Sequence, residues 1–503
     1  MKKGCQILIP LLVIMLTAWS CASFDPQARI APEGDIPKRF SLYSSEQGHA
    51  SRWWKEFGDP ELDALIEEAL SGNLSLVKAW ARLRQANAVI AQSRSGVYPS
   101  LEASAGASYT RQQITSEGGT ATLQSGSPAG QGIESKTTVR QKTEDYSLGL
   151  ASSYEIDLWG RMRSDRMATL LDYHATREDL NTAAVSIAGQ IAEQWINIIS
   201  QRMQRHLLQK QLETNLTYLE LVELRFNKGM VSVLDVFQQR QTVEQTRAQI
   251  PFIEAQERLL LNNLALLMGK PPNYPIHITR ETLPSLKSPP AAGLPADLLV
   301  NRPDVRSAGL QLEAADWQVS AARANRLPNL SLSGSAAYSA NELDLLFDNW
   351  ILTLAGNLIA PILDGGQRAA EVDRTRAIVD ERLSAYRESV VTAIKEVEDA
   401  LINEEKQQEH IAALELQLET ARKALNEAKQ RYLNGLKEYL PVLTQLLSVQ
   451  GLEQDMIQRK TELILYRVGL YRALGGTWTK DLNPESGLTQ VSGGPGEEEN
   501  NNG

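Results

Sequence analysis

The feature that most constrains this 503-residue sequence is an internal duplication. Segments of the first half recur in the second half at a constant spacing of 206 residues, without a gap. The matched pairs include Leu212 and Leu418, Arg225 and Arg431, Gly229 and Gly435, Gln239 and Gln445, and Gly269 and Gly475. Two unrelated amphipathic helices would rarely keep register over such a distance, so we expect one structural unit that occurs twice.

Earlier in each half the spacing changes to 229 residues, so the first half carries 23 additional residues. The matched pairs here are Arg94 and Arg323, Pro99 and Pro328, Leu101 and Leu330, and Tyr109 and Tyr338. The surplus falls within residues 110–143, which are rich in Gly, Ser, Thr and Gln. That composition predicts a long exposed loop.

Both halves contain segments that alternate between apolar and small polar residues, with strands expected at about 100–112 and 145–158, and at about 329–340 and 349–360. Between Leu101 and Tyr109, for example, the apolar side chains fall on every second residue. Alternation with a period of two indicates strands with one apolar face. A soluble sandwich and a membrane barrel, which is apolar toward lipid and polar toward its lumen, both fit this pattern.

The helical segments are unusually long. Between Gly366 and Asn434 there is no proline or glycine, and apolar residues from Val379 to Leu401 recur every three or four residues, as in a coiled coil. A continuous helix of this length would measure roughly 100 Å. A free coiled-coil rod is the alternative interpretation, but it does not explain why each long segment begins at the end of a strand hairpin.

Four strands per chain cannot close a membrane barrel, because about eight is the lower limit for barrels made from one chain. An open sheet edge in lipid would leave backbone groups unpaired, at several kcal/mol each. If these strands cross a membrane, several chains must therefore share one barrel. Two chains would supply about eight strands and three about twelve, and the residue pattern leaves both open.

The chain begins with basic residues, continues with a largely apolar stretch from Ile7 to Leu16, and has small residues near Cys21. This order predicts an export signal over residues 1–20. The residues before Cys21 resemble a lipobox, with Ser20 fitting and Ala18-Trp19 departing from it. We expect a covalent lipid on Cys21, which would tether the chain without spanning the membrane. The alternative is an incidental cysteine near an ordinary cleavage site.

Charge and motifs exclude several function classes. The net charge of −10 argues against a nucleic-acid-binding protein, which needs a basic surface. Both cysteines lie within the first 21 residues, so no disulfide framework or cysteine metal site is expected. The five histidines lack ligand spacing, and no nucleotide-binding, zinc-protease or serine-hydrolase motif occurs. We therefore expect neither an enzyme nor a cofactor other than the lipid.

Two signatures connect the sequence with a known family. The segment Trp53–Leu62, WWKEFGDPEL, and the segment Asn301–Arg306, NRPDVR, resemble the matching signatures in the two halves of TolC-type outer-membrane efflux proteins. The resemblance extends from about Trp53 to Thr477 and favours the lipoprotein branch, which is OprM/CusC-like and of NodT type.

This resemblance implies a mainly α-helical homotrimer with a 12-stranded membrane β-barrel, four strands per chain, on a long periplasmic α-helical barrel. It implies a passive exit duct in the outer membrane of a Gram-negative bacterium. The expected partners are a periplasmic adaptor, an inner-membrane pump usually of the RND type, and outer-membrane lipid, but no nucleic acid. A lipid-anchored periplasmic coiled-coil scaffold without channel activity is the alternative.

The resemblance also implies a division of the chain into six parts. These are a signal peptide (1–20), a lipidated segment with part of an equatorial belt (21–60), a first repeat (61–270), a linker in the belt (271–302), a second repeat (303–476) and a partly disordered tail (477–503).

The expected gate lies at two helical hairpin tips, at Gly229 and Gly435. In TolC-like proteins an acidic residue six positions after the first glycine links to a tyrosine and a basic residue of the neighbouring tip. Asp235 matches the acid, while Tyr432 and Lys437 match its partners. Lysine lacks the planar fork of arginine, so we expect a looser clasp. A solvated surface trio is the competing interpretation.

The sequence departs from the family at the constriction. Many relatives carry acidic rings just after the second tip glycine, but the TolC-like positions here are Pro441 and Thr444. Lys437 stands where some lipoprotein relatives have aspartate, and Glu438 is the only acidic residue nearby. We therefore do not expect the usual cation-binding ring.

Overall fold

The computed structural model describes residues 24–26, 37, 39–42, 52–117, 136–287, 290, 293–476 and 478–482. Cys21 and the tail beyond residue 482 lie outside the described residues. By contact, the chain divides into a strand unit and a helical unit. The strand unit comprises Met1–Gln27, Val89–Leu170 and Ala315–Ile378, and the helical unit comprises Ala28–Ala88, Leu171–Ala314 and Val379–Gly503.

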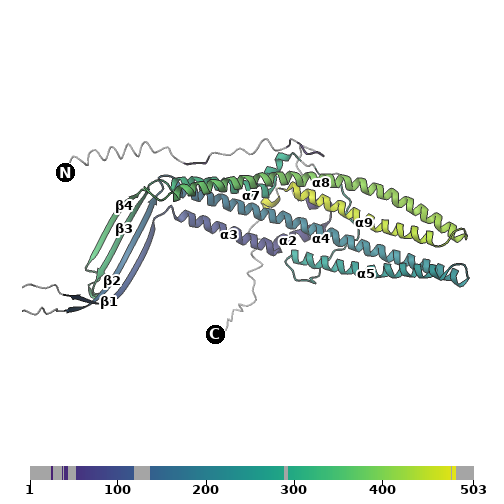
Figure 1. Ribbon diagram of the computed structural model, residues 1–503, viewed down its shortest axis with the longest axis horizontal. Coiled ribbons are helices and arrows are strands. Elements are labelled where there is room, and N and C mark those ends of the chain that lie inside the picture. Colours follow the sequence, from purple (N-terminus) through teal and green to yellow (C-terminus); the bar gives the residue numbers. More distant parts are fainter. Residues whose placement is uncertain are drawn as a thin grey trace, which may run out of the picture. The chain divides into compact units, whose positions relative to one another are not determined.

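The strand unit contains one antiparallel sheet with the strand order β1-β2-β3-β4 (Figure 1). Its strands are β1 (Ser100–Glu117), β2 (Lys136–Ile156), β3 (Asn329–Ala340) and β4 (Trp350–Ile359). A short 3-10 helix, η3 (Leu343–Leu345), lies between the last two strands. The prediction of four alternating strands, one hairpin from each half, is confirmed.

The register gives this sheet one apolar face and one polar face. Leu101 lies opposite Ser152, Tyr146 opposite Ala340, and Tyr338 opposite Trp350, so alternate residues of all four strands share a face. Leu354 is 82% exposed and Leu101 is 73% exposed, which leaves the apolar face uncovered within the described chain. We call this the outer face. The opposite face carries mainly Ser, Gly, Ala and Thr.

The prediction of a loop over residues 110–143 is wrong at both of its ends. Strand β1 continues to Glu117 and β2 begins at Lys136, with residues 110–117 paired to residues 136–143. The β-branched residues here, such as Ile114 opposite Val139, favour extended backbone and cross-strand packing. Residues 118–135 lie outside the described part of the chain.

Long helices make up most of the remaining structure, and they occur in pairs of equal length. Helices α4 (Arg161–Asn227) and α8 (Gln367–Leu433) each have 67 residues. Helices α5 (Val233–Leu267) and α9 (Leu440–Leu474) each have 35, and α3 (Leu74–Ser95) and α7 (Pro303–Ala324) each have 22. The equal lengths support the duplication seen in the sequence.

The remaining elements are short. They are η1 (Trp53–Phe57), α2 (Pro60–Gly72), η2 (Pro295–Asp297), α6 (Leu298–Asn301) and η4 (Trp478–Asp481). Among the described residues, no helix is both long and apolar enough to cross a membrane.

The core of the helical unit joins distant parts of the chain through aromatic side chains. The Trp53 ring stacks on the Tyr471 ring with centroids 5.2 Å apart, and Trp54 meets Trp478 edge-on at 4.9 Å. All four side chains are at least 96% buried and pack with apolar residues of α4. Such contacts fix the segments before α2 and after α9 against the long helices.

A buried ion pair ties the segment 271–302 to the same helices. The Arg467 guanidinium on α9 pairs with the Glu404 carboxylate on α8, and each side chain is only 2% exposed. Arg467 also donates to the carbonyl oxygen of Lys287 at 3.2 Å. Removing either partner would leave a buried charge uncompensated and would destabilise the fold by about 3–5 kcal/mol. Because Arg467 also binds the Lys287 carbonyl, the pair helps to hold the linker in place.

Candidate functional site at the helical tips

Two turns of the same geometry end the long helices. Gly229 has φ 69° and Gly435 has φ 70°, in the left-handed region that favours glycine. Beyond each glycine, the next amide donates to the carbonyl oxygen five residues back, from Met230 to Arg225 and from Leu436 to Arg431, both at 2.9 Å. These hydrogen bonds satisfy the last carbonyl groups of α4 and α8.

Asp235 lies in the first turn of helix α5, as its third residue. Its carboxylate accepts the Ser232 amide at 3.0 Å, and the Ser232 hydroxyl accepts the Asp235 amide at 3.4 Å. This reciprocal capping box satisfies two backbone donors, and the negative charge suits the positive end of the helix. Within one chain the predicted acid therefore has a local structural role.

Tyr432 is 2% exposed, and its ring lies 4.4 Å from the Arg225 guanidinium carbon. Burial raises the pKa of its hydroxyl above the ordinary value, and the nearby Asp235 carboxylate adds to this while Arg225 opposes it. The hydroxyl has no hydrogen-bond partner in the described chain. The structure thus brings Tyr432 near Asp235 but leaves its polar atom unsatisfied.

Lys437 and Glu438 are exposed on the second turn. Neither forms an ion pair with any residue that the structure describes, Asp235 included. Of the predicted trio, one chain brings together the acid and the tyrosine but not the lysine.

A buried polar contact between the two hairpins was missed from the sequence. The Tyr439 hydroxyl donates to the Gln239 side-chain oxygen at 2.6 Å, and the Gln239 amide donates to the Asn215 carbonyl at 2.7 Å. Gln450 continues the network with a 2.8 Å bond to the Asn215 side chain. The recurrence of Gln239 as Gln445 was a signal, but spacing alone could not reveal its partners.

Tyr439 and Gln239 are both completely buried. Burial is the main reason that the pKa of the Tyr439 hydroxyl is raised well above its usual value, with smaller contributions from Tyr218, Tyr432 and Asp235. The neutral phenol is therefore the form that this contact requires.

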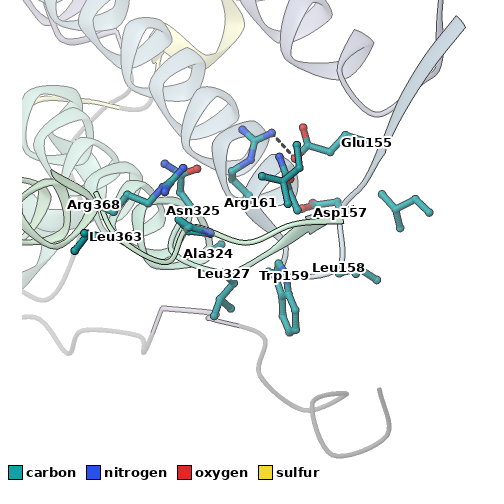
Figure 2. A pocket seen from close by; sticks show the side chains of 14 residues that line it. Glu155, Asp157, Leu158, Trp159, Arg161, Ala324, Asn325, Leu327, Leu363 and Arg368 are labelled. Carbon is teal, nitrogen blue, oxygen red and sulfur yellow. Dashed lines mark hydrogen bonds and ion pairs between the residues drawn. The ribbon is translucent and has the colours of Figure 1, made fainter. Parts of the chain in front are cut away.

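A hollow of about 390 Å³ lies in the strand unit, where the strands meet the ends of the helices (Figure 2). Its polar lining includes Glu155, Asp157, Arg161 and Arg368. Arg161 pairs with Glu155 at 2.8 Å, and the Asp157 carboxylate accepts the Arg163 amide at 2.8 Å. Glu155 and Asp157 are thus already bound to an arginine side chain and to a backbone amide. Nowhere in the described ranges do His, Cys, Asp and Glu gather into a metal-binding group.

Comparison with known proteins identifies the family. The family described as "Outer membrane efflux protein" matches residues 65–270 and 294–476. The pyoverdine export outer membrane protein OpmQ of Pseudomonas aeruginosa is 33% identical over 438 residues, which cover 87% of this chain and 90% of that protein. The cation efflux system protein CusC of Escherichia coli is 27% identical over 94% of this chain and 99% of its own length.

Solved structures agree. The outer-membrane channel OprN superposes with a TM-score of 0.79 at 26% identity, covering 91% of this chain and all of that chain. A CusC structure superposes with a TM-score of 0.76 at 26% identity, covering 90% and 99%. The resemblance found in the sequence is thereby confirmed, and so is the expectation of a channel that is not an enzyme. The chain belongs to the outer membrane efflux protein family, the outer-membrane channels of Gram-negative efflux pumps.

Proposed function

We propose that three copies of this chain form one passive exit duct, with a shared 12-stranded barrel above a tunnel of helices. The observation that carries this proposal is the open sheet with an uncovered apolar face. Strands β1 and β4 each have one neighbour only, so each presents an unpaired edge in the described chain. In lipid such edges cost several kcal/mol per group, and pairing β4 of one copy with β1 of the next removes them.

The dimensions of the outer face support a membrane span. Ten residue steps separate Tyr146 from Ile156 on β2. At about 3.4 Å per residue and a tilt of about 40°, they cover a height of about 26 Å, close to the apolar band of outer-membrane barrels. Aromatic side chains mark one end of the band, because Tyr146, Tyr338 and Trp350 lie within two residues of one another in the register.

The lipid anchor on Cys21 fits the opposite end of the strand unit, next to the start of α4. Asp25, only four residues later, lies 3.9 Å from Arg163 in the first turn of α4, measured between Oδ1 and a guanidinium nitrogen. Four residues of extended chain reach at most about 14 Å. A lipid on Cys21 would therefore reach the membrane boundary at the helical end of the sheet.

The partners of the duct are a periplasmic adaptor and an inner-membrane pump, for which we propose the RND type. Relatives of this chain are named for pyoverdine export, solvent efflux and cation efflux. One channel fold that serves such different cargo is consistent with selection in the pump and passive conduction in the duct. Residues 21–60, 271–302 and the segment after α9 would form the belt around the helices.

The gate that we propose uses contacts between neighbouring copies. Asp235 would accept a hydrogen bond from Tyr432 of the neighbouring tip in its own copy and one from Lys437 of the next copy, closing the mouth, with Glu438 beside them. The unsatisfied Tyr432 hydroxyl supports this, since a buried hydroxyl without a partner costs about 1–3 kcal/mol. Exposed ion pairs are worth about 0–1 kcal/mol, which suits a latch that must open.

Planar-bilayer recording and native mass spectrometry of the purified protein test the duct. We expect trimers with discrete conductance. Monomers without conductance, extracted in buffer that lacks detergent, would favour the periplasmic scaffold instead.

The gate has its own test. Asp235→Ala should raise the resting conductance because it removes the acceptor for both partners. Ser232→Ala is the matched control, since it weakens the same capping box but keeps the carboxylate. Equal conductance in Asp235→Ala and the unmodified protein would remove the latch assignment.

A further inference from the structure

The first strand hairpin is longer than the second. Strand β3 ends at Ala340, opposite Tyr146, so residues 108–117 of β1 and 136–145 of β2 pair only with each other. Figure 1 shows these two strands running on past the ends of β3 and β4. The second hairpin has no counterpart, because its strands end at Ala340 and resume at Trp350. We call this paired extension the ribbon.

The register assigns one face of the ribbon to the outer face of the sheet. Tyr109 lies opposite Glu144 on that face, followed by Arg111 opposite Lys142 and by Gln113 opposite Arg140. The outer-face residues of the four-stranded part are all uncharged, from Leu101 to Ala107 and at the matching positions of the other strands. Three cations therefore follow directly after the apolar band and its aromatic residues.

These cations have no anionic partner in the described chain. Arg111, Arg140 and Lys142 are exposed, and none of them forms an ion pair with another described residue. The polar contact of Arg140 is with the neutral Gln113 side chain, at 3.2 Å. Glu144, the one acidic residue at this level of the outer face, accepts the Tyr146 hydroxyl at 3.3 Å.

Such an arrangement is unfavourable without an external anion. Like charges directly opposite each other in a sheet repel, yet Arg111 and Lys142 face each other in a chain whose net charge is −10. Arginine forks bind phosphate oxygens in pairs, and lysine adds a mobile charge. The chemistry of the cluster therefore fits a phosphorylated ligand.

Its position on the sheet indicates where that ligand comes from. The ribbon lies at the end of the strands opposite to the helices, so in the proposed duct it faces the outside of the cell. Lys142 is four residues beyond Tyr146, which places it about 10 Å beyond the aromatic level after allowance for strand tilt. Headgroups extend about 5–8 Å beyond the hydrocarbon, and long basic side chains reach back toward them.

We propose that Arg111, Arg140 and Lys142 bind the phosphate groups of the lipid that surrounds the barrel in the outer leaflet, a phosphorylated glycolipid of the lipid A type. This inference rests on the proposed function, because the outer face meets lipid only if the strands form a membrane barrel. The bound headgroup neutralises the cations that the fold places side by side, and it fixes the ribbon at the membrane surface.

The test compares two triple variants in the full-length trimer. Arg111→Gln, Arg140→Gln and Lys142→Gln together remove the cluster. Lys395→Gln, Lys406→Gln and Lys423→Gln together remove the same charge from exposed positions of α8, where the side chains are 59–76% exposed. Native mass spectrometry measures the binding of bisphosphorylated lipid A, of dephosphorylated lipid A and of inorganic phosphate to each protein.

We expect the cluster variant to bind bisphosphorylated lipid A on the order of 100-fold more weakly than the unmodified trimer, at about a factor of five per cation. The α8 variant should bind as the unmodified protein does, and dephosphorylated lipid A should bind weakly to all three. Equal binding by the two variants would overturn the proposal. Displacement of the glycolipid by equimolar inorganic phosphate would also overturn it, because the site would then recognise free phosphate.

A parallel conductance measurement separates this inference from the duct itself. If the unmodified protein forms conducting trimers but binds lipid A no better than the cluster variant does, the lipid site is wrong and the duct stands. If the unmodified protein is monomeric and does not conduct, the duct is wrong, and the lipid site is overturned with it. Binding of an acidic protein to the cluster in place of lipid A would likewise overturn the lipid assignment.

Discussion

The two helical tips share a turn but differ in how the next helix starts. At the first tip, Ser232 and Asp235 form a complete capping box within α5. At the second tip, Tyr439 occupies the capping position of α9 without any side-chain cap. The first tip therefore supplies its own helix start, whereas the second depends on contacts beyond its own turn.

Those contacts come from the first hairpin. The rings of Tyr432 and Tyr439 lie 5.4 Å apart and form a buried cluster with Val222 and Val236 of the other hairpin. The Tyr439 hydroxyl adds the bond to Gln239. One tip of the duplicated unit is thus self-contained and the other is anchored, so movement of the second tip requires the loss of buried contacts.

The largest expected effect follows removal of that anchor. Tyr439→Ala should destabilise the second tip by about 3–5 kcal/mol, because it creates a cavity and leaves the buried Gln239 oxygen without a donor. Hydrogen exchange of the amides in residues 433–445 measures the local opening. Phe237→Ala is the control at the first tip, where the ring is 58% exposed and its loss should cost under about 0.5 kcal/mol. Comparable exchange in both variants would show that the second tip is not anchored.

The tip glycines should behave alike, because the turns are the shared part. A Cβ added at Gly229 or Gly435 meets no atom within 4 Å, so an alanine would be destabilising only through the strain of its left-handed backbone. Gly229→Ala and Gly435→Ala should therefore each cost about 1–2 kcal/mol. Hydrogen exchange at the C-terminal turns of α4 and α8 checks this. A cost confined to one of them would mean that the two turns are not equivalent.

Much of the fold follows from local patterns in the sequence. Alternation identified the outer face of the sheet, and the 206-residue spacing identified helices that prove equal in length. The ribbon was missed because Gly, Ser and Thr are typical of loops, whereas the pairing of Ile114 with Val139 depends on two strands meeting. Composition describes one segment at a time, and a β-ribbon is a property of two.

The site was predicted less completely for the same reason. The tip glycines could be located because turns are local, whereas Asp235 was named through the resemblance to the family and its capping role was not predicted. The bond between Tyr439 and Gln239 joins residues 200 positions apart, and nothing in either segment specifies the other. The partner of the Tyr432 hydroxyl stays a prediction, because no described residue accepts a hydrogen bond from it.

Alkaline pH should destabilise the second tip through ionisation of Tyr439. The pKa of Tyr439 is raised in the folded chain, so its phenol stays protonated at pH values where an unfolded tyrosine, with a pKa of 10.0, ionises. Stability is therefore complete below pH 10 and is lost as the pH rises above it, by about 1.4 kcal/mol at pH 11. Hydrogen exchange at pH 9 and 11, corrected for intrinsic rates, should show this loss at residues 433–445. Tyr439→Phe removes the titrating group and should flatten the dependence, and an unchanged slope would exclude Tyr439 as its source.

The smallest expected effect tests the self-contained tip. Ser232→Ala removes one half of the capping box, so the first turn of α5 should lose about 1 kcal/mol. Ser232→Thr keeps the hydroxyl and should restore most of this loss. Because α9 has no side-chain cap and starts from buried tyrosines, its exchange should not change in either variant. Faster exchange at α9 in Ser232→Ala would mean that the capping box supports both tips, and the division between a self-contained tip and an anchored one would then fail.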